Sequence, residues 1–175
     1  MRIAFLGDIA LFGVYSKNNN NFLIDKLTDI SNYLQQFDLV VGNLESPFSI
    51  KKRTKGAKSA YVCSDVENVE VLKELHIDIV NLANNHLFDY GEEGYEMTKS
   101  VLSKFGIEWF GVDAKTVEVL KDSNKLLFMG YCCHSTNPLC VIEQEGDRGI
   151  NAYNVKRVME DIVCAKENGY FPIVS

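Results

Sequence analysis

Short apolar runs alternate along the chain with stretches in which apolar residues recur every three or four positions. The apolar runs lie at residues 3–6, 39–41, 77–82, 109–110, 125–131 and 170–175. The helical patterns lie at residues 23–34, 66–75, 95–105 and 155–163, with a short helical piece at 115–120. Strands that alternate with helices are typical of βαβ units. The pattern therefore predicts an α/β fold, in which a layered, largely parallel sheet is flanked by helices.

Each helical pattern places its apolar residues on one face. In the first helix, Leu27, Ile30 and Leu34 share a face that should cover the sheet. In the last helix, apolar residues stand at 155, 158, 159, 162 and 163, which is again helical spacing.

The expected helix ends carry residues that favour capping. Ser64 and Glu67 have the spacing of a capping box, in which two side chains satisfy free backbone amides at a helix start. Asn154 precedes the last helix and is a favoured N-cap residue. His76 and Gly106 stand where two helices should close, which predicts a structural role for His76.

The size and charge of the chain limit its function. Its 175 residues, 46% of them hydrophobic, suit a single domain spanning 1–175. The net charge of −6 gives no electrostatic reason to expect nucleic acid as a partner. The basic residues within 51–58 are expected to form a solvated loop. We expect no signal peptide and no membrane span, because no apolar run is long enough.

The cysteines favour a reducing compartment. They number five, and Cys132 and Cys133 are adjacent, which disfavours a disulfide between them. The chain has no CxxC pair, so a zinc site that combines His134 with Cys132, Cys133 and Cys140 is disfavoured as well. We therefore expect reduced thiols and a cytoplasmic protein.

Polar side chains that suit catalysis follow three successive strands. Parallel α/β sheets bind ligands just beyond the carboxyl ends of their strands, so these side chains should meet. Carboxylates, amides and imidazole suit Mn, Fe or Zn ions near a phosphate. Singly, each residue also has a structural explanation as a turn former, an ion-pair partner or a surface histidine. The candidates are Asp8 after the first strand, Asn43 and Glu45 after the second, and Asn84, Asn85 and His86 after the third.

Taken together, these segments resemble the CapA family of capsule and poly-γ-glutamate synthesis proteins. The resemblance is carried by Gly-Asp at 7–8, Asn-Leu-Glu-Ser-Pro at 43–47, Leu-Ala-Asn-Asn-His at 82–86 and Asp-Tyr-Gly at 89–91. That family is similar to the calcineurin-like metallophosphoesterases. The resemblance therefore implies a metallophosphoesterase-like fold and a site for two divalent metal ions.

The resemblance also implies roles for single residues. Asp8 would ligate the first metal, Glu45 would bridge or neighbour both, and Asn85 would ligate the second. His86 would lie over the scissile phosphate, stabilising charge or acting as a general acid. The two metals would activate a bridging water for attack on a phosphorylated or anionic substrate related to the polymer.

Asn43 and Asn84 are candidates for orienting ligands or substrate. The family's further metal ligands follow the strand that begins near residue 171. We therefore expect the chain to be truncated before the second half of the sheet.

Other functions stay open at this point. The same site could serve a non-catalytic assembly component that holds an anionic polymer or a partner. A nucleotide-binding Rossmann module is disfavoured, because the first strand is followed by Gly-Asp-Ile-Ala and not by GxGxxG. A mechanism with Asp8 as nucleophile is disfavoured, because Ala10 stands where a second Asp is needed. The oligomeric state cannot be predicted.

Overall fold

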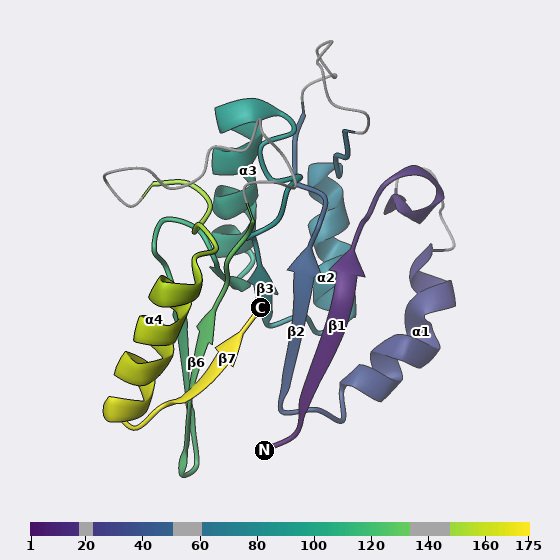
Figure 1. The fold of residues 1–175 in the computed structure, drawn as a ribbon. Coiled ribbons are helices and arrows are strands. Elements are labelled where there is room, and N and C mark those ends of the chain that lie inside the picture. Colours follow the sequence, from purple (N-terminus) through teal and green to yellow (C-terminus); the bar gives the residue numbers. More distant parts are fainter. Residues whose placement is uncertain (18–22, 51–60, 134–147) are drawn as a thin grey trace.

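The computed structural model describes residues 1–17, 23–50, 61–133 and 148–175. A four-stranded parallel sheet has the order β1-β2-β3-β4, and a three-stranded sheet has the order β5-β6-β7 (Figure 1). The first comprises β1 (Ile3–Ile9), β2 (Leu39–Leu44), β3 (Ile79–Asn81) and β4 (Glu108–Phe110). The second comprises β5 (Val117–Lys121), β6 (Asn124–Met129) and β7 (Phe171–Val174). The predicted α/β architecture is confirmed, with one antiparallel pair, β5–β6.

Helices cover the outer faces of the two sheets (Figure 1). They are α1 (Leu23–Leu34), α2 (Val69–Glu74), α3 (Gly91–Lys104) and α4 (Val155–Glu167), with short 3-10 helices η1 (Gly13–Tyr15) and η3 (Val66–Asn68). α1, α2 and α3 share a core with one face of the parallel sheet, and α4 lies against the second sheet. The result is four layers, with helices outside and two sheets inside.

Alternation along each strand divides the core in two. In β2, Val40 and Leu44 point to the helices, whereas Leu39 and Val41 point to the second sheet. Side chains of a strand alternate between faces, so a strand between two layers is apolar on both. Phe128 of β6 fills the space between the sheets and is fully buried.

Asn81 joins the two sheets at the carboxyl ends of their strands. Its amide oxygen accepts a hydrogen bond from the Ala83 backbone at 2.9 Å, and its amide nitrogen donates to the Ser175 hydroxyl at 3.2 Å. A Cβ atom on Gly111 or Gly130 would lie 2.5 Å or 2.3 Å from that amide oxygen. Both positions therefore require glycine for the close approach of the backbone.

We expect Gly130→Ala to destabilise the protein, because the new methyl would also lie 3.0 Å from the Gly111 Cα atom. Overpacking of this kind costs about 1–3 kcal/mol in the free energy of unfolding, which urea denaturation measures. Gly7→Ala is the matched control, since a Cβ there has no neighbour within 4 Å. Equal stability of the two variants would contradict the close approach around Asn81.

Asp113 anchors the connection between β4 and β5 to α3. The Tyr95 hydroxyl and the Lys99 ammonium both donate to its carboxylate, the latter at 2.7 Å. The backbone amide of Gly149 donates to it at 2.9 Å. Burial raises the pKa of Asp113, but the hydrogen bonds from Lys99, Tyr95 and Gly149 outweigh it and hold this pKa below its ordinary value of 3.8.

This depressed pKa predicts a pH dependence of stability. The contribution of Asp113 is fully present above pH 3.8 and is lost as the pH falls through the lower pKa of the folded state. We expect Asp113→Asn to lose less stability than the wild type on acidification, measured by urea denaturation at a series of pH values. Asp29→Asn, at an exposed position of α1, serves as the control. Parallel acid profiles for wild type and Asp113→Asn would contradict the assignment.

The helical piece predicted at 115–120 is wrong, because these residues lie largely in β5. Val117 and Val119 pack between the sheets, whereas Glu118 points to the other face. This two-residue period belongs to a strand. β5 then turns into β6 at Asp122, whose φ of 54° is left-handed.

The predicted capping box is also wrong. The Ser64 hydroxyl donates to the Leu11 carbonyl at 2.9 Å, and η3 begins after Asp65 with no side-chain cap. Ser64 thus serves a tertiary contact instead of a helix end. The other helix ends are confirmed: Asn154 accepts from two amides of the first turn of α4, and His76 closes α2 with a left-handed φ of 55°. Gly106 closes α3 in the same way, with a left-handed φ of 68°.

Two apolar faces are less buried than their spacing predicted. Ile30 of α1 is 49% exposed, so the predicted inward position is wrong for this residue. In α4, Val155, Met159 and Val163 are exposed, and Ala165 is the fully buried residue.

The basic residues at 51–58, together with His134 and Cys140, lie outside the described residues. None of the four described cysteines forms a disulfide with another of them.

Pro172 lies in β7 with its backbone turned away from β6. Ser175 exchanges both of its backbone hydrogen bonds with the β6 side, donating to the Met129 carbonyl and accepting from the Tyr131 amide. Since backbone groups alternate along a strand, Ile173 also faces β6, whereas Pro172 faces the opposite edge. That edge therefore carries a residue with no N–H group.

Candidate functional site

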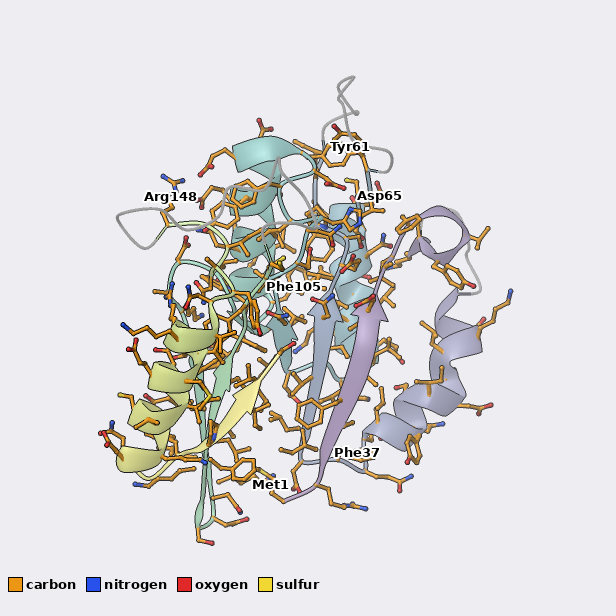
Figure 2. All side chains as sticks on the ribbon, viewed as in Figure 1. Met1, Phe37, Tyr61, Asp65, Phe105 and Arg148 are labelled. Atoms are coloured by element: carbon orange, nitrogen blue, oxygen red, sulfur yellow. The ribbon has the colours of Figure 1, made fainter. Side chains whose placement is uncertain are left out.

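The register of the parallel sheet places candidate residues of neighbouring strands side by side. Asp8 is the partner of Asn43, and Asn43 is the partner of Asn81 in the next strand. The strands run parallel, so all three residues lie at the same, carboxyl-terminal edge of the sheet. The side chains of Tyr61 and Asp65 mark this end of the molecule in Figure 2, and Met1 and Phe37 mark the other.

Asn43 holds the two acidic side chains of the site together. Its amide nitrogen donates to Asp8 Oδ1 and to Glu45 Oε2, each at 2.8 Å. An amide N–H between two carboxylates offsets part of their repulsion. Asp8 of β1 and Glu45, which directly follows β2, are thereby held close together.

The turn after β3 is fixed against the end of β2. The Asn84 amide nitrogen donates to the Leu44 carbonyl at 2.8 Å and lies 3.4 Å from Asn43 Oδ1. The Asn84 amide oxygen accepts from the His86 backbone at 3.0 Å. Asn84 is buried and connects the second strand end to the turn that carries the half-buried Asn85 and His86.

His86 lies between two carboxylates. Its Nδ1 atom is 2.7 Å from Asp89 Oδ2, and its Nε2 atom is 3.5 Å from Glu45 Oε1. The Asp89 side chain is fully buried, and it also accepts from the Val62 backbone at 2.8 Å. Asp89 therefore fixes both the ring of His86 and the chain that enters η3.

The hydrogen-bonding chemistry defines the proton on Nδ1. An ionised carboxylate only accepts hydrogen bonds, so the contact with Asp89 requires a proton on Nδ1 of His86. In the neutral ring, Nε2 then presents a lone pair toward Glu45 Oε1. Two acceptors that face each other are complementary only when a proton or a cation lies between them. The arrangement thus directs Nε2 of His86 into the site.

The sequence alone did not identify Asp89 as a site residue. Asp89 was named only as part of the Asp-Tyr-Gly segment, with no role of its own. The i,i+3 spacing from His86 within a single turn was the signal that could have identified it. Contacts link Asp8, Asn43, Glu45, Asn84 and His86 at one sheet edge, and Asn85 lies in the turn between Asn84 and His86.

A buried polar network fixes the chain that follows Asp8. The Leu11 amide donates to the Ser46 hydroxyl at 3.1 Å, and the Leu11 carbonyl accepts from Asn68 and Ser64, each at 2.9 Å. Ser46, Ser64 and Asn68 are all fully buried. Buried polar groups that satisfy one another make a rigid connection, so the β1 exit is held in place.

The side chains at the strand ends are of the kinds that bind a divalent metal ion, but the described ones are too few to complete its coordination. Asp8, Glu45 and His86 offer the oxygen and nitrogen atoms that such ions take. Asn43, however, occupies one oxygen of each carboxylate. Within the described residues, no three His, Cys, Asp or Glu side chains form a group that could hold a metal ion. The described residues thus fit part of a metal ligand set.

The layered sheets and the polar residues at their strand ends define the class: an α/β protein with a metallophosphoesterase-like fold. The family comparison gives the narrower result. Residues 2–175 match the family described as "Bacterial capsule synthesis protein PGA_cap", and the chain belongs to this family. Membership associates it with the synthesis of capsule or poly-γ-glutamate.

Two curated relatives come from Bacillus. The chain is 30% identical over 110 residues to the PGA biosynthesis protein CapA of Bacillus subtilis (strain 168), which covers 62% of the chain and 29% of the relative. It is 27% identical over 132 residues to the capsule biosynthesis protein CapA of Bacillus anthracis, covering 73% of the chain and 31% of the relative. The aligned part thus spans about a third of the length of these relatives. Among the described residues, no helix is long and apolar enough to cross a membrane.

We expect Asp89→Ala to release the ring of His86 and to leave the Val62 amide without its acceptor. Removing an acceptor from a buried donor costs about 1–3 kcal/mol of stability. Nitrogen NMR of the His86 ring should show the Nδ1–H form in the wild type and a mixture of forms in the variant. Asp89→Asn keeps an acceptor oxygen and should retain the Nδ1–H form. An unchanged ring in Asp89→Ala would contradict the role of Asp89.

Proposed function

We propose that this chain provides part of a metal-dependent phosphoesterase site that acts in the synthesis of a capsular polymer or poly-γ-glutamate. The observation that carries the proposal is the pair of contacts made by His86. Asp89 holds Nδ1, and Nε2 faces Glu45 at the strand ends where Asp8 and Asn43 also lie. The substrate proposed is a phosphorylated or anionic molecule related to the polymer.

In such a site, the candidate residues would have separate roles. Asp8, Glu45 and Asn85 would provide ligands for divalent ions, Mn, Fe or Zn, two of them in the complete site. When bound, these ions would polarise the phosphoryl group and supply Lewis-acid assistance. His86, with its Nε2 atom directed into the site, would stabilise negative charge or protonate the leaving oxygen. Asn43 and Asn84 would orient the ligands and the substrate.

A second function is favoured by the contacts of Asn43, which occupy one oxygen each of Asp8 and Glu45 and leave fewer carboxylate oxygens for a metal ion. The same strand ends would then serve a non-catalytic component that holds an anionic polymer or a partner during polymer assembly. The predicted cytoplasmic location and single domain stay predictions in either case.

Manganese-dependent hydrolysis of p-nitrophenyl phosphate tests the first function. We expect the full-length protein to hydrolyse this substrate and to bind manganese, and we expect Asp8→Ala in that protein to reduce both by at least about 100-fold. Asp25→Ala, at an exposed position of α1, is the matched control and should leave both unchanged.

The outcome decides between the two functions. Turnover that survives Asp8→Ala would remove the metal assignment. A protein that binds no manganese and hydrolyses no phosphoester, but binds poly-γ-glutamate, would support the non-catalytic component.

A further inference from the structure

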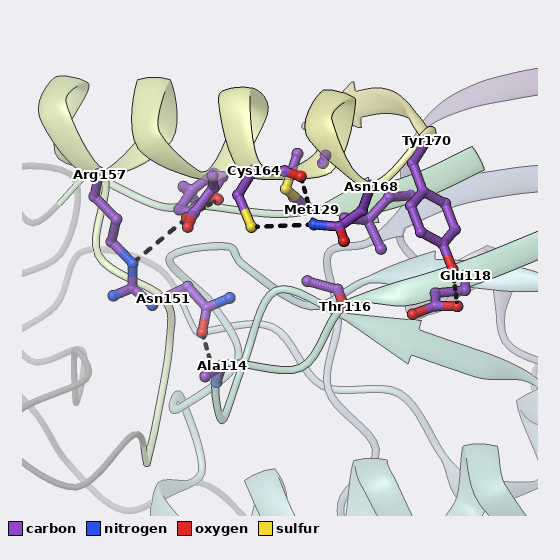
Figure 3. Close-up of a pocket in the computed structure, with 13 residues that line it drawn as sticks. Ala114, Thr116, Glu118, Met129, Asn151, Arg157, Cys164, Asn168 and Tyr170 are labelled. Atoms are coloured by element: carbon purple, nitrogen blue, oxygen red, sulfur yellow. Dashed lines mark hydrogen bonds and ion pairs between the residues drawn. The ribbon is translucent and has the colours of Figure 1, made fainter. Parts of the chain in front are cut away.

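A cavity lies between α4 and the outer face of the second sheet (Figure 3). Its volume is about 600 Å³, within the usual range for small-molecule sites. It shares no residue with the candidate site at the strand ends. The lining residues are Ala114, Thr116, Glu118, Leu127, Met129, Tyr131, Asn151, Arg157, Asp161, Cys164, Ala165, Asn168 and Tyr170.

The cavity follows from the alternation along β5 and β6 and from the way α4 packs. Val117 and Phe128 fill the core between the sheets, so their neighbours Glu118, Leu127 and Met129 point outward into the cavity. α4 contributes residues 157, 161, 164, 165 and 168, whose spacing belongs to one helix face. Leu127 is half-buried and provides the apolar surface that a ligand reaches, whereas Met129 and Ala165 are buried beneath it.

Hydrogen bonds hold the walls of the cavity in place. The Tyr131 hydroxyl donates to Asp161 Oδ2 at 2.5 Å, which joins the end of β6 to α4. The Tyr170 hydroxyl donates to Glu118 Oε2 at 2.5 Å, which joins the start of β7 to β5. The buried Asn151 accepts from the Ala114 amide at 3.0 Å and donates to the Gly130 carbonyl at 3.2 Å. The cavity is therefore shaped before any ligand enters.

The two ends of the cavity differ in charge. Arg157 and Glu118 lie at opposite ends of the cavity (Figure 3). Arg157 Nε is 3.8 Å from Asp161 Oδ2, so the charges at that end offset each other. Glu118 has no ion-pair partner among the described residues, and Tyr170 uses only its Oε2 atom. The Glu118 end is thus negative, next to an apolar surface.

We propose that this cavity binds an aliphatic primary amine. Its ammonium group donates to Glu118 Oε1, the oxygen that Tyr170 does not use, and its aliphatic part packs on Leu127, the cross-strand partner of Glu118. An ammonium group is the natural partner of a carboxylate, and the apolar surface favours a hydrocarbon chain over a small hydrated cation. Neutral or anionic analogues of the same size lack the charge that Glu118 recognises.

Binding of hexylamine, monitored by NMR of the Met129 and Ala165 methyl groups, tests the proposal with hexanol and hexanoate as matched analogues. We expect hexylamine to bind at least about tenfold more tightly than either, the value of one charged hydrogen bond. Glu118→Gln should weaken hexylamine binding by about the same factor and remove the preference over hexanol. Glu74→Gln, on α2 and far from the cavity, is the control.

Tyr170→Phe separates the charge of Glu118 from the integrity of the wall. It removes the hydrogen bond to Glu118 but keeps the carboxylate, so hexylamine binding should stay within about threefold of the wild type. Unchanged thermal unfolding of Glu118→Gln establishes that the variant is folded. Absence of hexylamine binding, equal binding of hexanol, or full binding by Glu118→Gln would each overturn the proposal.

Discussion

The register of the parallel sheet is the constraint on which the rest of the structure depends. Asp8 aligns with Asn43, and Asn43 aligns with Asn81, across three adjacent strands. A shift by one residue would turn every side chain of a strand to the opposite face. It would separate Asp8 from the amide of Asn43 and would also exchange the helix-facing and sheet-facing halves of the core. The site and the core are therefore specified together.

The two sheets meet at the same end as the candidate site. Asn81 connects the end of β3 to Ser175 after β7, and the glycines at 111 and 130 allow the backbones to approach its amide oxygen. The network around Leu11 fixes the neighbouring exit from β1. The polar groups at this end are thus held by a buried framework of hydrogen bonds, which gives them fixed positions independently of any bound ligand.

Much of the architecture could be predicted from local patterns. The apolar runs located six of the seven strands in the described part of the chain. The polar residues after the first three strands identified one sheet edge, because parallel strands place their carboxyl ends together. β5 was missed because Val117, Val119 and Leu120 satisfy a short helical spacing as well as a two-residue period. Over six residues, only the packing against β6 decides between them.

Other features depended on contacts that no local pattern contains. Ser64 has a favourable capping sequence, but a buried carbonyl at Leu11 takes its hydroxyl, and tertiary contact overrides the local preference. The pairing of Asp89 with His86 needs the turn that follows β3, whose course is set by Asn84 and the end of β2. The cavity beside α4 depends on how far the helix lies from β5, which apolar spacing along the helix does not determine.

Among the described strands β7 pairs with β6 alone, and Pro172 gives its other edge a property that concerns the protein's behaviour at high concentration. An exposed strand edge is a template on which further chains can add and grow into aggregates. A proline that faces this edge offers no donor, so a strand that pairs across it cannot complete a regular hydrogen-bond ladder there. An antiparallel pairing of two β7 strands centred on this residue would lack a donor on both chains.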